Sequence, residues 1–167
     1  RTVGTLIFCD LTSPYFNFTL IPSGGATLTF NNSGSGASLI QTNNTSTADT
    51  DSVPVILAEN LLVTNRGAVT LSGAISGLGK SITKTGTGLL TLAGTNSYSG
   101  GTFVNNGQLS LLRTASLPST GTVTVANGAT LAIGAGGTGT FSASDIDALY
   151  ANTLAGISLG ASSVVGV

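Results

Sequence analysis

The chain has 167 residues, enough for one domain with its own core. Charged residues make up 7% of it and hydrophobic residues 41%, which excludes a disordered polar tract, because such a tract pairs low hydrophobicity with high charge. With five basic residues, a net charge of −1 and no apolar run of membrane-spanning length, we expect no nucleic-acid partner and no membrane insertion by this chain.

The first twenty residues contain apolar and aromatic side chains. Cys9 has no second cysteine to pair with, so we expect a buried structural thiol, with a reactive or intermolecular thiol as the alternative. Tyr15, Phe16 and Phe18 cluster within SPYFNFTL, and Tyr98 lies further along the chain. We expect stacked aromatic side chains inside the fold, and the alternative is an exposed platform for sugars.

Residues 33–54 are polar and lose the alternation of apolar residues, so we expect an irregular loop or insertion there. Asp49 and Asp51 lie in this segment. In an extended chain they would share a face, and with neighbouring oxygen atoms they could bind Ca²⁺, which makes them the candidate metal ligands. The favoured alternative is a solvated loop without a metal, and we expect no cofactor.

A repeat near 20 residues long runs through much of the chain. Stretches of alternating apolar residues start at Gly67, Gly88, Gly107 and Gly128, 19 to 21 residues apart. Within a stretch every second residue is apolar, as in a strand with one buried face. Stacking the copies would align like side chains in columns, with about 4.8 Å between turns. The period predicts an all-β fold, a parallel β-helix of roughly eight turns that forms a single domain over residues 1–167.

Near the C-terminus the period changes. Ile146, Leu149 and Leu154 recur at helical spacing, so we expect a short helix over residues 144–153 with Ser144 as its N-cap. Strand character resumes after this helix. No polar capping turn follows, and we expect a longer parent chain or stacking on another copy.

Residues 80–112, KSITKTGTGLLTLAGTNSYSGGTFVNNGQLSLL, carry the most regular copy. They resemble the autotransporter-associated β-strand repeat of bacterial passenger domains, which has a lysine-threonine-glycine turn, a corner with asparagine, tyrosine and two glycines, and an asparagine-glycine turn. The resemblance implies a right-handed β-helix that a bacterium secretes to its cell surface, with repeats that help the passenger to cross the outer membrane. It implies purely architectural roles for the matching residues, which are Lys84, Gly86, Leu90, Leu92, Asn96, Tyr98, Gly100, Gly101, Val104, Asn106, Gly107, Leu109 and Leu111.

Side chains suited to catalysis are scarce. The chain has no histidine, which removes Ser-His and Cys-His pairs. Asp145 and Asp147 fit the start of the expected helix and would not face the same way, so we expect no catalytic residue and no enzyme. We expect an extracellular structural scaffold, adhesin-like or passenger-like, whose partners are further copies of itself, surface glycans or host-cell molecules. The alternatives are a subunit that stacks end to end into an extracellular fibre and, less favoured, a carbohydrate-active enzyme.

Overall fold

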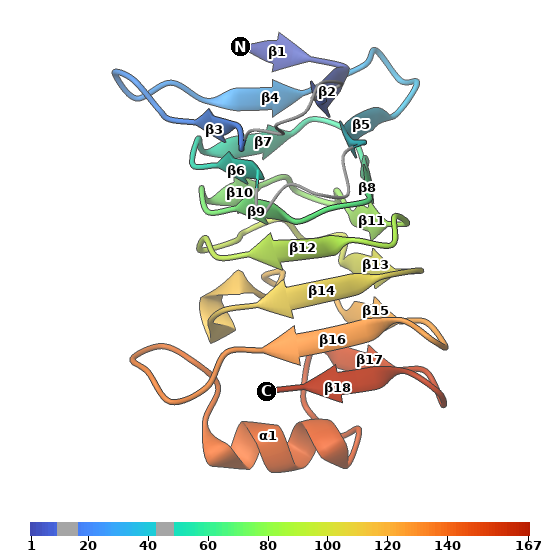
Figure 1. Ribbon diagram of the computed structural model, residues 1–167. Helices are drawn as coiled ribbons and strands as arrows, with labels where there is room; N and C mark the ends of the chain where they lie inside the picture. Colours follow the sequence, from blue (N-terminus) through green and yellow to red (C-terminus); the bar gives the residue numbers. More distant parts are fainter. Residues whose placement is uncertain (10–16, 43–48) are drawn as a thin grey trace.

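The computed structural model describes residues 1–9, 17–42 and 49–167, and these residues form a parallel β-helix (Figure 1). The chain winds through three sheets, called A, B and C below, and the strands within each sheet pair in parallel. Backbone hydrogen bonds therefore run between one turn and the next. The predicted all-β fold and its parallel β-helix are confirmed, while the handedness and the number of turns stay predictions.

Among the described residues, sheet A has four strands, and sheets B and C have seven each. Sheet A contains β1 (Thr2–Val3), β4 (Leu28–Phe30), β7 (Val55–Leu57) and β10 (Ile75–Ser76). Sheet B contains β2 (Thr5–Phe8), β5 (Ala37–Gln41), β8 (Leu61–Asn65), β11 (Ile82–Lys84), β13 (Thr102–Val104), β15 (Val123–Val125) and β17 (Ile157–Leu159). Sheet C contains β3 (Thr19–Leu20), β6 (Asp49–Asp51), β9 (Val69–Leu71), β12 (Leu89–Leu92), β14 (Gln108–Leu111), β16 (Thr130–Ile133) and β18 (Val164–Gly166).

The inner face of sheet C shows how the period near 20 residues builds the core. Its apolar side chains align in two columns, which are Val69–Leu90–Leu109–Leu131 and Leu71–Leu92–Leu111–Ile133. Each of these side chains is at most 3% exposed. Burying one such side chain contributes roughly 1.5–3 kcal/mol, so each turn adds to the stability of the next. The predicted stacking of like side chains is confirmed.

The segment expected to be an irregular loop, residues 33–54, contains two strands. β5 joins sheet B and β6 joins sheet C, so the expected loop is wrong for these residues. Residues 43–48 lie outside the described part of the chain. The stacking register overrides the low strand propensity of aspartate, because each strand is held on both sides by the backbone of its neighbours.

The C-terminal end of the coil carries a helix, as expected. α1 (Ala143–Tyr150) lies across this end, beyond β16 and β18 (Figure 1). The Ser142 hydroxyl accepts a hydrogen bond from the Asp145 N–H, and the Asp145 carboxylate accepts one from the Ser142 N–H. The expected span, 144–153, and the expected N-cap, Ser144, are shifted, because Ser142 has Asp145 three residues later and so forms this reciprocal pair.

The helix covers the last turn with its apolar face. Leu149 is fully buried, and Ile146 and Leu154 pack against the core. Beyond α1, Asn152 adopts a left-handed backbone conformation with φ 54°. Its side-chain Oδ1 accepts a hydrogen bond from the Leu159 N–H at 3.0 Å, and its Nδ2 donates to the Leu159 carbonyl at 3.3 Å. A carboxamide thus bonds the last strand of sheet B as a neighbouring strand would.

The aromatic and cysteine predictions have mixed outcomes. Tyr98 is buried, whereas Phe18 is 40% exposed and its ring stacks on Phe8 with centroids 6.5 Å apart. Tyr15 and Phe16 lie outside the described residues. Cys9 is exposed, so the expected buried thiol is wrong: Phe8, the last residue of β2, is buried, and Cys9 has the opposite parity, that of the exposed Ile7. No helix in the described part of the chain is long and apolar enough to span a membrane.

Candidate functional site

A set of polar side chains is buried inside the coil among the apolar columns. Because a buried polar group without a partner costs roughly 1–3 kcal/mol, the hydrogen bonds of these residues show what holds the corners of the coil together. The set contains Gln41, Asp49, Asp51, Asn65, Lys84, Asn96, Thr102 and Ser116.

Lys84 is a fully buried lysine at the end of β11. Its Nζ donates hydrogen bonds to the Gly86 carbonyl, in the same turn, and to the Asn106 carbonyl of the next turn at 3.3 Å. Burial lowers the pKa of the Lys84 ammonium to about 8. The amine therefore bonds carbonyl groups of two successive turns from the inside of the coil.

The corner between sheets B and C, called the B–C corner, uses a different polar side chain in each of three turns. In the turn before that of Lys84, Asn65 Nδ2 donates hydrogen bonds to the Gly67 carbonyl at 2.6 Å and to the Leu89 carbonyl at 2.8 Å. One turn earlier, Gln41 Oε1 accepts a hydrogen bond from the Gly67 N–H at 2.7 Å. The same task, bonding the backbone where the strands end, is thus done by an amide oxygen, an amide nitrogen and an ammonium.

Asn96 holds three turns together at the place where sheet A stops after β10. Its Oδ1 accepts a hydrogen bond from the Ile75 N–H of the previous turn at 3.1 Å. Its Nδ2 donates to the Ser116 carbonyl at 2.8 Å, in η1 (Thr114–Ser116) of the following turn. The Asn96 carboxamide therefore supplies hydrogen bonds that a regular strand would otherwise make through its backbone.

Tyr98 fills the interior of the coil near Asn96, where sheet A stops. It is fully buried, and its hydroxyl lies 2.5 Å from the Thr102 hydroxyl oxygen, which is also buried. Burial raises the pKa of Tyr98 to about 12, although the hydrogen bond with Thr102 acts in the opposite direction. The ring adds apolar contact, and its hydroxyl has a partner, as a buried tyrosine requires.

The glycines of the repeat permit close contact between turns. A Cβ atom on Gly86 would lie 2.0 Å from the Asn65 carbonyl oxygen, which is far inside van der Waals contact. Gly107 has φ +72°, and a Cβ there would lie 2.3 Å from the Gly86 carbonyl oxygen. These two positions therefore exclude any side chain, by contact at the first and by both contact and backbone conformation at the second.

The other residues that the resemblance singled out also have structural positions. Leu90, Leu92, Leu109, Leu111 and Val104 are fully buried in the core. The Asn106 side chain accepts a hydrogen bond from the Gly107 N–H at 2.8 Å, and a Cβ on Gly100 or Gly101 would meet the backbone of a neighbouring turn at 2.6 or 2.7 Å. Taken with Lys84, Asn96 and Tyr98, they form one architectural set.

Asp49 and Asp51 share the inner face of β6 and are nearly or fully buried. This shared face agrees with the prediction made for an extended chain. The favoured prediction, a solvated loop at these residues, is wrong. Asp49 Oδ1 accepts a hydrogen bond from the Phe18 N–H at 2.9 Å, and Asp51 Oδ1 accepts one from the Val53 N–H at 2.8 Å. Burial raises the pKa of Asp51, and the Val53 N–H opposes that effect. In the described part of the chain, no group of three or more His, Cys, Asp or Glu residues is placed to hold a metal ion.

Gln41 and Asn65 were not among the predicted functional residues, and the position of Lys84 inside the coil was not predicted either. The signal for all three is their position in the alternation of the strand. Each is the last residue of its strand and has the same parity as buried apolar residues before it, such as Val63 before Asn65 and Ile82 before Lys84. Parity along the strand therefore predicts burial even where the residue type does not.

Comparisons with known proteins identify one segment. No curated protein and no solved structure matches the chain. Residues 82–111 match the model of the family described as Passenger-associated-transport-repeat. The match covers β11 through β14 and includes the buried lysine, the asparagine-tyrosine corner and the leucine columns. The resemblance predicted from the sequence is thus confirmed over residues 82–111, which match a passenger-associated-transport repeat.

Proposed function

We propose that the chain is a non-enzymatic structural segment of a bacterial passenger, displayed at the cell surface, where its stacked turns extend the secreted protein outwards. One observation carries the proposal. The polar residues of the matched repeat, above all Lys84 and Asn96, point into the coil and bond to the backbone of adjacent turns. Their chemistry is used to stack turns, which is what an extended scaffold requires.

The positions of the carboxylates argue against a carbohydrate-active enzyme. Asp49 and Asp51 lie inside the coil, where a polysaccharide cannot reach them. The Asp145 carboxylate accepts hydrogen bonds from the N–H and the hydroxyl of Ser142 as part of the cap of α1, and these bonds lower its pKa. Glycoside hydrolysis needs two carboxyl groups that flank a substrate, and these residues do not supply such a pair.

The fibre alternative needs two open ends, and one end is partly closed. Leu159 in β17 has its N–H and carbonyl bonded to the Asn152 side chain, while the next residue, Gly160, bonds back to Val125 in β15. Asn152 therefore occupies the outer edge of β17, where the strand of another molecule would add. Light scattering and electron microscopy of the purified chain should show discrete particles; fibres at high concentration would favour the alternative.

Surface display tests the structural role. The chain is fused ahead of an autotransporter translocator in a Gram-negative host, and the amount at the surface is measured by adding protease to intact cells. We expect a displayed, protease-resistant product from the unchanged chain and a smaller, protease-sensitive amount from Asn96→Ala. Asn105→Ala removes an exposed asparagine of the same repeat and is the matched control. Equal display and equal resistance for all three chains would contradict the proposal.

A further inference from the structure

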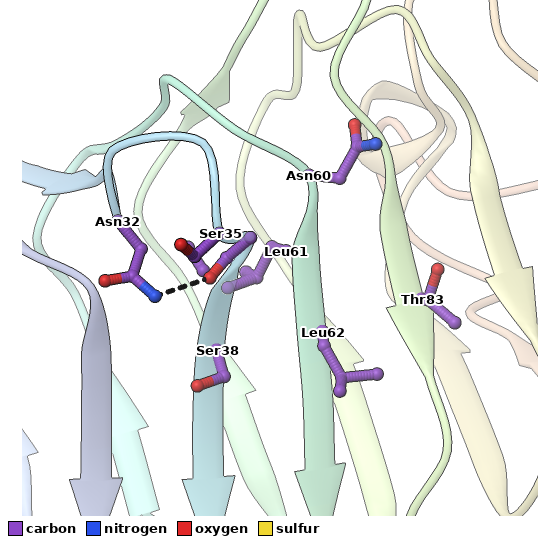
Figure 2. A pocket seen from close by; sticks show the side chains of 9 residues that line it. Asn32, Ser35, Ser38, Asn60, Leu61, Leu62 and Thr83 are labelled. Atoms are coloured by element: carbon purple, nitrogen blue, oxygen red, sulfur yellow. Dashed lines mark hydrogen bonds between the residues drawn. The ribbon is translucent and has the colours of Figure 1, made fainter.

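The outer surface of sheet B contains a groove that the structural role does not use. It has a volume of about 520 Å³, within the size range of small-molecule sites, and runs across β5, β8 and β11 (Figure 2). The polar side chains that line it are Asn32, Ser35, Ser38, Asn60 and Thr83. A second hollow of about 470 Å³, which includes Glu59 and Lys80, shares the Ser35 and Asn60 linings with it.

One wall of the groove is a loop held in a fixed shape. Asn32 Nδ2 donates a hydrogen bond to the Gly36 carbonyl at 3.0 Å, as Figure 2 shows. From the next turn, Glu59 Oε1 accepts a hydrogen bond from the Gly34 N–H. Ser33 adopts φ 56°, which the Asn31 side chain supports by accepting a hydrogen bond from its N–H. The wall is therefore formed before any ligand arrives, which reduces the entropy lost on binding.

The groove offers hydrogen-bonding groups that no described residue uses. Asn60 Oδ1 accepts a hydrogen bond from the Ser81 N–H at 3.1 Å, which orients the amide, and no residue in the described ranges bonds to its Nδ2. Within the same ranges, Asn32 Oδ1 and the hydroxyls of Ser35 and Thr83 also have no hydrogen-bond partner. The lining contains no charged side chain. A donor, an acceptor and hydroxyls without net charge match a ligand that is polar and neutral.

Apolar side chains alternate with the hydroxyls along the same surface. On the outer face of sheet B, Leu62 pairs in register with Thr83, and Thr83 pairs with Phe103. Leu62 is 42% exposed and Phe103 is 40% exposed. Neighbouring residues of this column are about 4.8 Å apart, the distance between strands. Sugars combine hydroxyl groups with apolar C–H faces, and aromatic rings and aliphatic side chains bind those faces.

We propose that this groove and the column Leu62–Thr83–Phe103 bind a neutral oligosaccharide along the axis of the coil. The Asn32 and Asn60 amides and the Thr83 hydroxyl bond the sugar hydroxyls, and Leu62 and Phe103 contact the C–H faces of successive sugar units. The proposal does not depend on the structural role, because display at the surface and binding of a glycan have separate readouts.

Calorimetric titration of the purified chain with cellohexaose, laminarihexaose and mannohexaose tests the inference, with a hyaluronan hexasaccharide as the charged comparison. We expect at least one neutral hexasaccharide to bind more tightly than the charged one. Thr83→Val keeps the shape and strand propensity of the residue but removes its hydroxyl, and we expect it to weaken binding about fivefold. Phe103→Thr, which removes the ring, should weaken binding by about tenfold.

Thr91→Val is the matched control, because Thr91 is a half-buried threonine on the outer face of sheet C. It should bind the hexasaccharide as tightly as the unchanged chain. Urea unfolding of each variant checks that the fold is intact, so a loss of binding in Thr83→Val with an unchanged unfolding midpoint supports the site. The inference is overturned if none of the neutral hexasaccharides binds, if the charged one binds more tightly, or if Thr83→Val and Phe103→Thr behave like Thr91→Val.

Discussion

β6 and β12 occupy equivalent places in sheet C but carry opposite chemistry on their inner faces. β12 presents Leu90 and Leu92 to the core, whereas β6 presents Asp49 and Asp51. All four side chains are buried in the same two columns, two turns apart. The comparison shows that the backbone pairing between turns decides where a strand forms, and that the inward side chain only modifies its stability.

The two regions differ in how completely their buried polar atoms are bonded. In the matched repeat, Lys84, Asn96 and Tyr98 each have hydrogen-bond partners. In the earlier turns, Asp51 Oδ2 and Asn65 Oδ1 are buried with no partner among the described residues. The repeat is therefore the part of the coil in which local sequence and stacking agree, and the earlier turns keep polar groups at an energetic cost.

The largest expected effect comes from adding a side chain where two turns of the repeat are in close contact. Gly86→Ala would place a methyl group against the Asn65 backbone, and we expect the free energy of unfolding to fall by about 4 kcal/mol or more. Gly137→Ala is the control, since the nearest atom there is the Thr140 methyl carbon at 3.4 Å. Urea unfolding measures both, and a loss below about 1 kcal/mol for Gly86→Ala would mean that the turns are not in close contact.

Removing the Asn96 side chain should have the next largest effect. Asn96→Ala leaves the Ile75 N–H and the Ser116 carbonyl buried without partners, and we expect a loss of about 2–3 kcal/mol in the free energy of unfolding. Asn105→Ala, at an exposed position of the same repeat, should change it by less than about 0.5 kcal/mol. Similar losses for the two variants would contradict the bonding described for Asn96.

Lys84 should make the stability of the chain depend on pH in the alkaline range. The folded chain releases the Lys84 proton near pH 8, whereas the unfolded chain keeps it up to the ordinary lysine pKa of 10.5. Between these values the unfolded state binds more protons, so stability should rise with pH, by up to about 1.4 kcal/mol per unit. Unfolding midpoints from pH 7.5 to 10 measure the rise.

Lys84→Met should flatten that rise, because it removes the titrating group from the core. Lys80→Met makes the same chemical change at a lysine that is only partly buried, and it should keep the rise. An unchanged slope in Lys84→Met would show that the Lys84 amine does not lose its proton in the folded coil within this range.

The smallest effect should come from Asp51. Its contribution to stability should fall as pH rises, whereas that of Lys84 should increase. The raised pKa of Asp51 means that the stability this residue contributes is complete at acid pH, below the ordinary value of 3.8, and is lost as pH rises through the raised value. Asp51→Asn keeps an oxygen for the Val53 N–H and should stabilise the chain at pH 7 by about 1 kcal/mol, with less gain near pH 4. Asp147→Asn, at an exposed position, is the control. A destabilised Asp51→Asn would contradict the energetic cost assigned to the buried Asp51 Oδ2, which has no partner among the described residues.

The sequence predicts the coil wherever residue type and strand parity agree. Leu90, Leu92, Leu109 and Leu111 are strand formers at inward positions, so both the strands and their stacking were predictable. β6 was not predictable, because aspartate is rare in strands and only the neighbouring turns hold it in register. The groove on sheet B also escaped prediction, since it joins a loop, residues 32–36, to strands from later turns.

The Asn152 side chain bonds to the last strand of sheet B, at the end of the coil that α1 covers. The Asn152 carboxamide and α1 bond to and pack on the last layer alone, so whole turns duplicated upstream of Ser142 would leave these contacts unchanged.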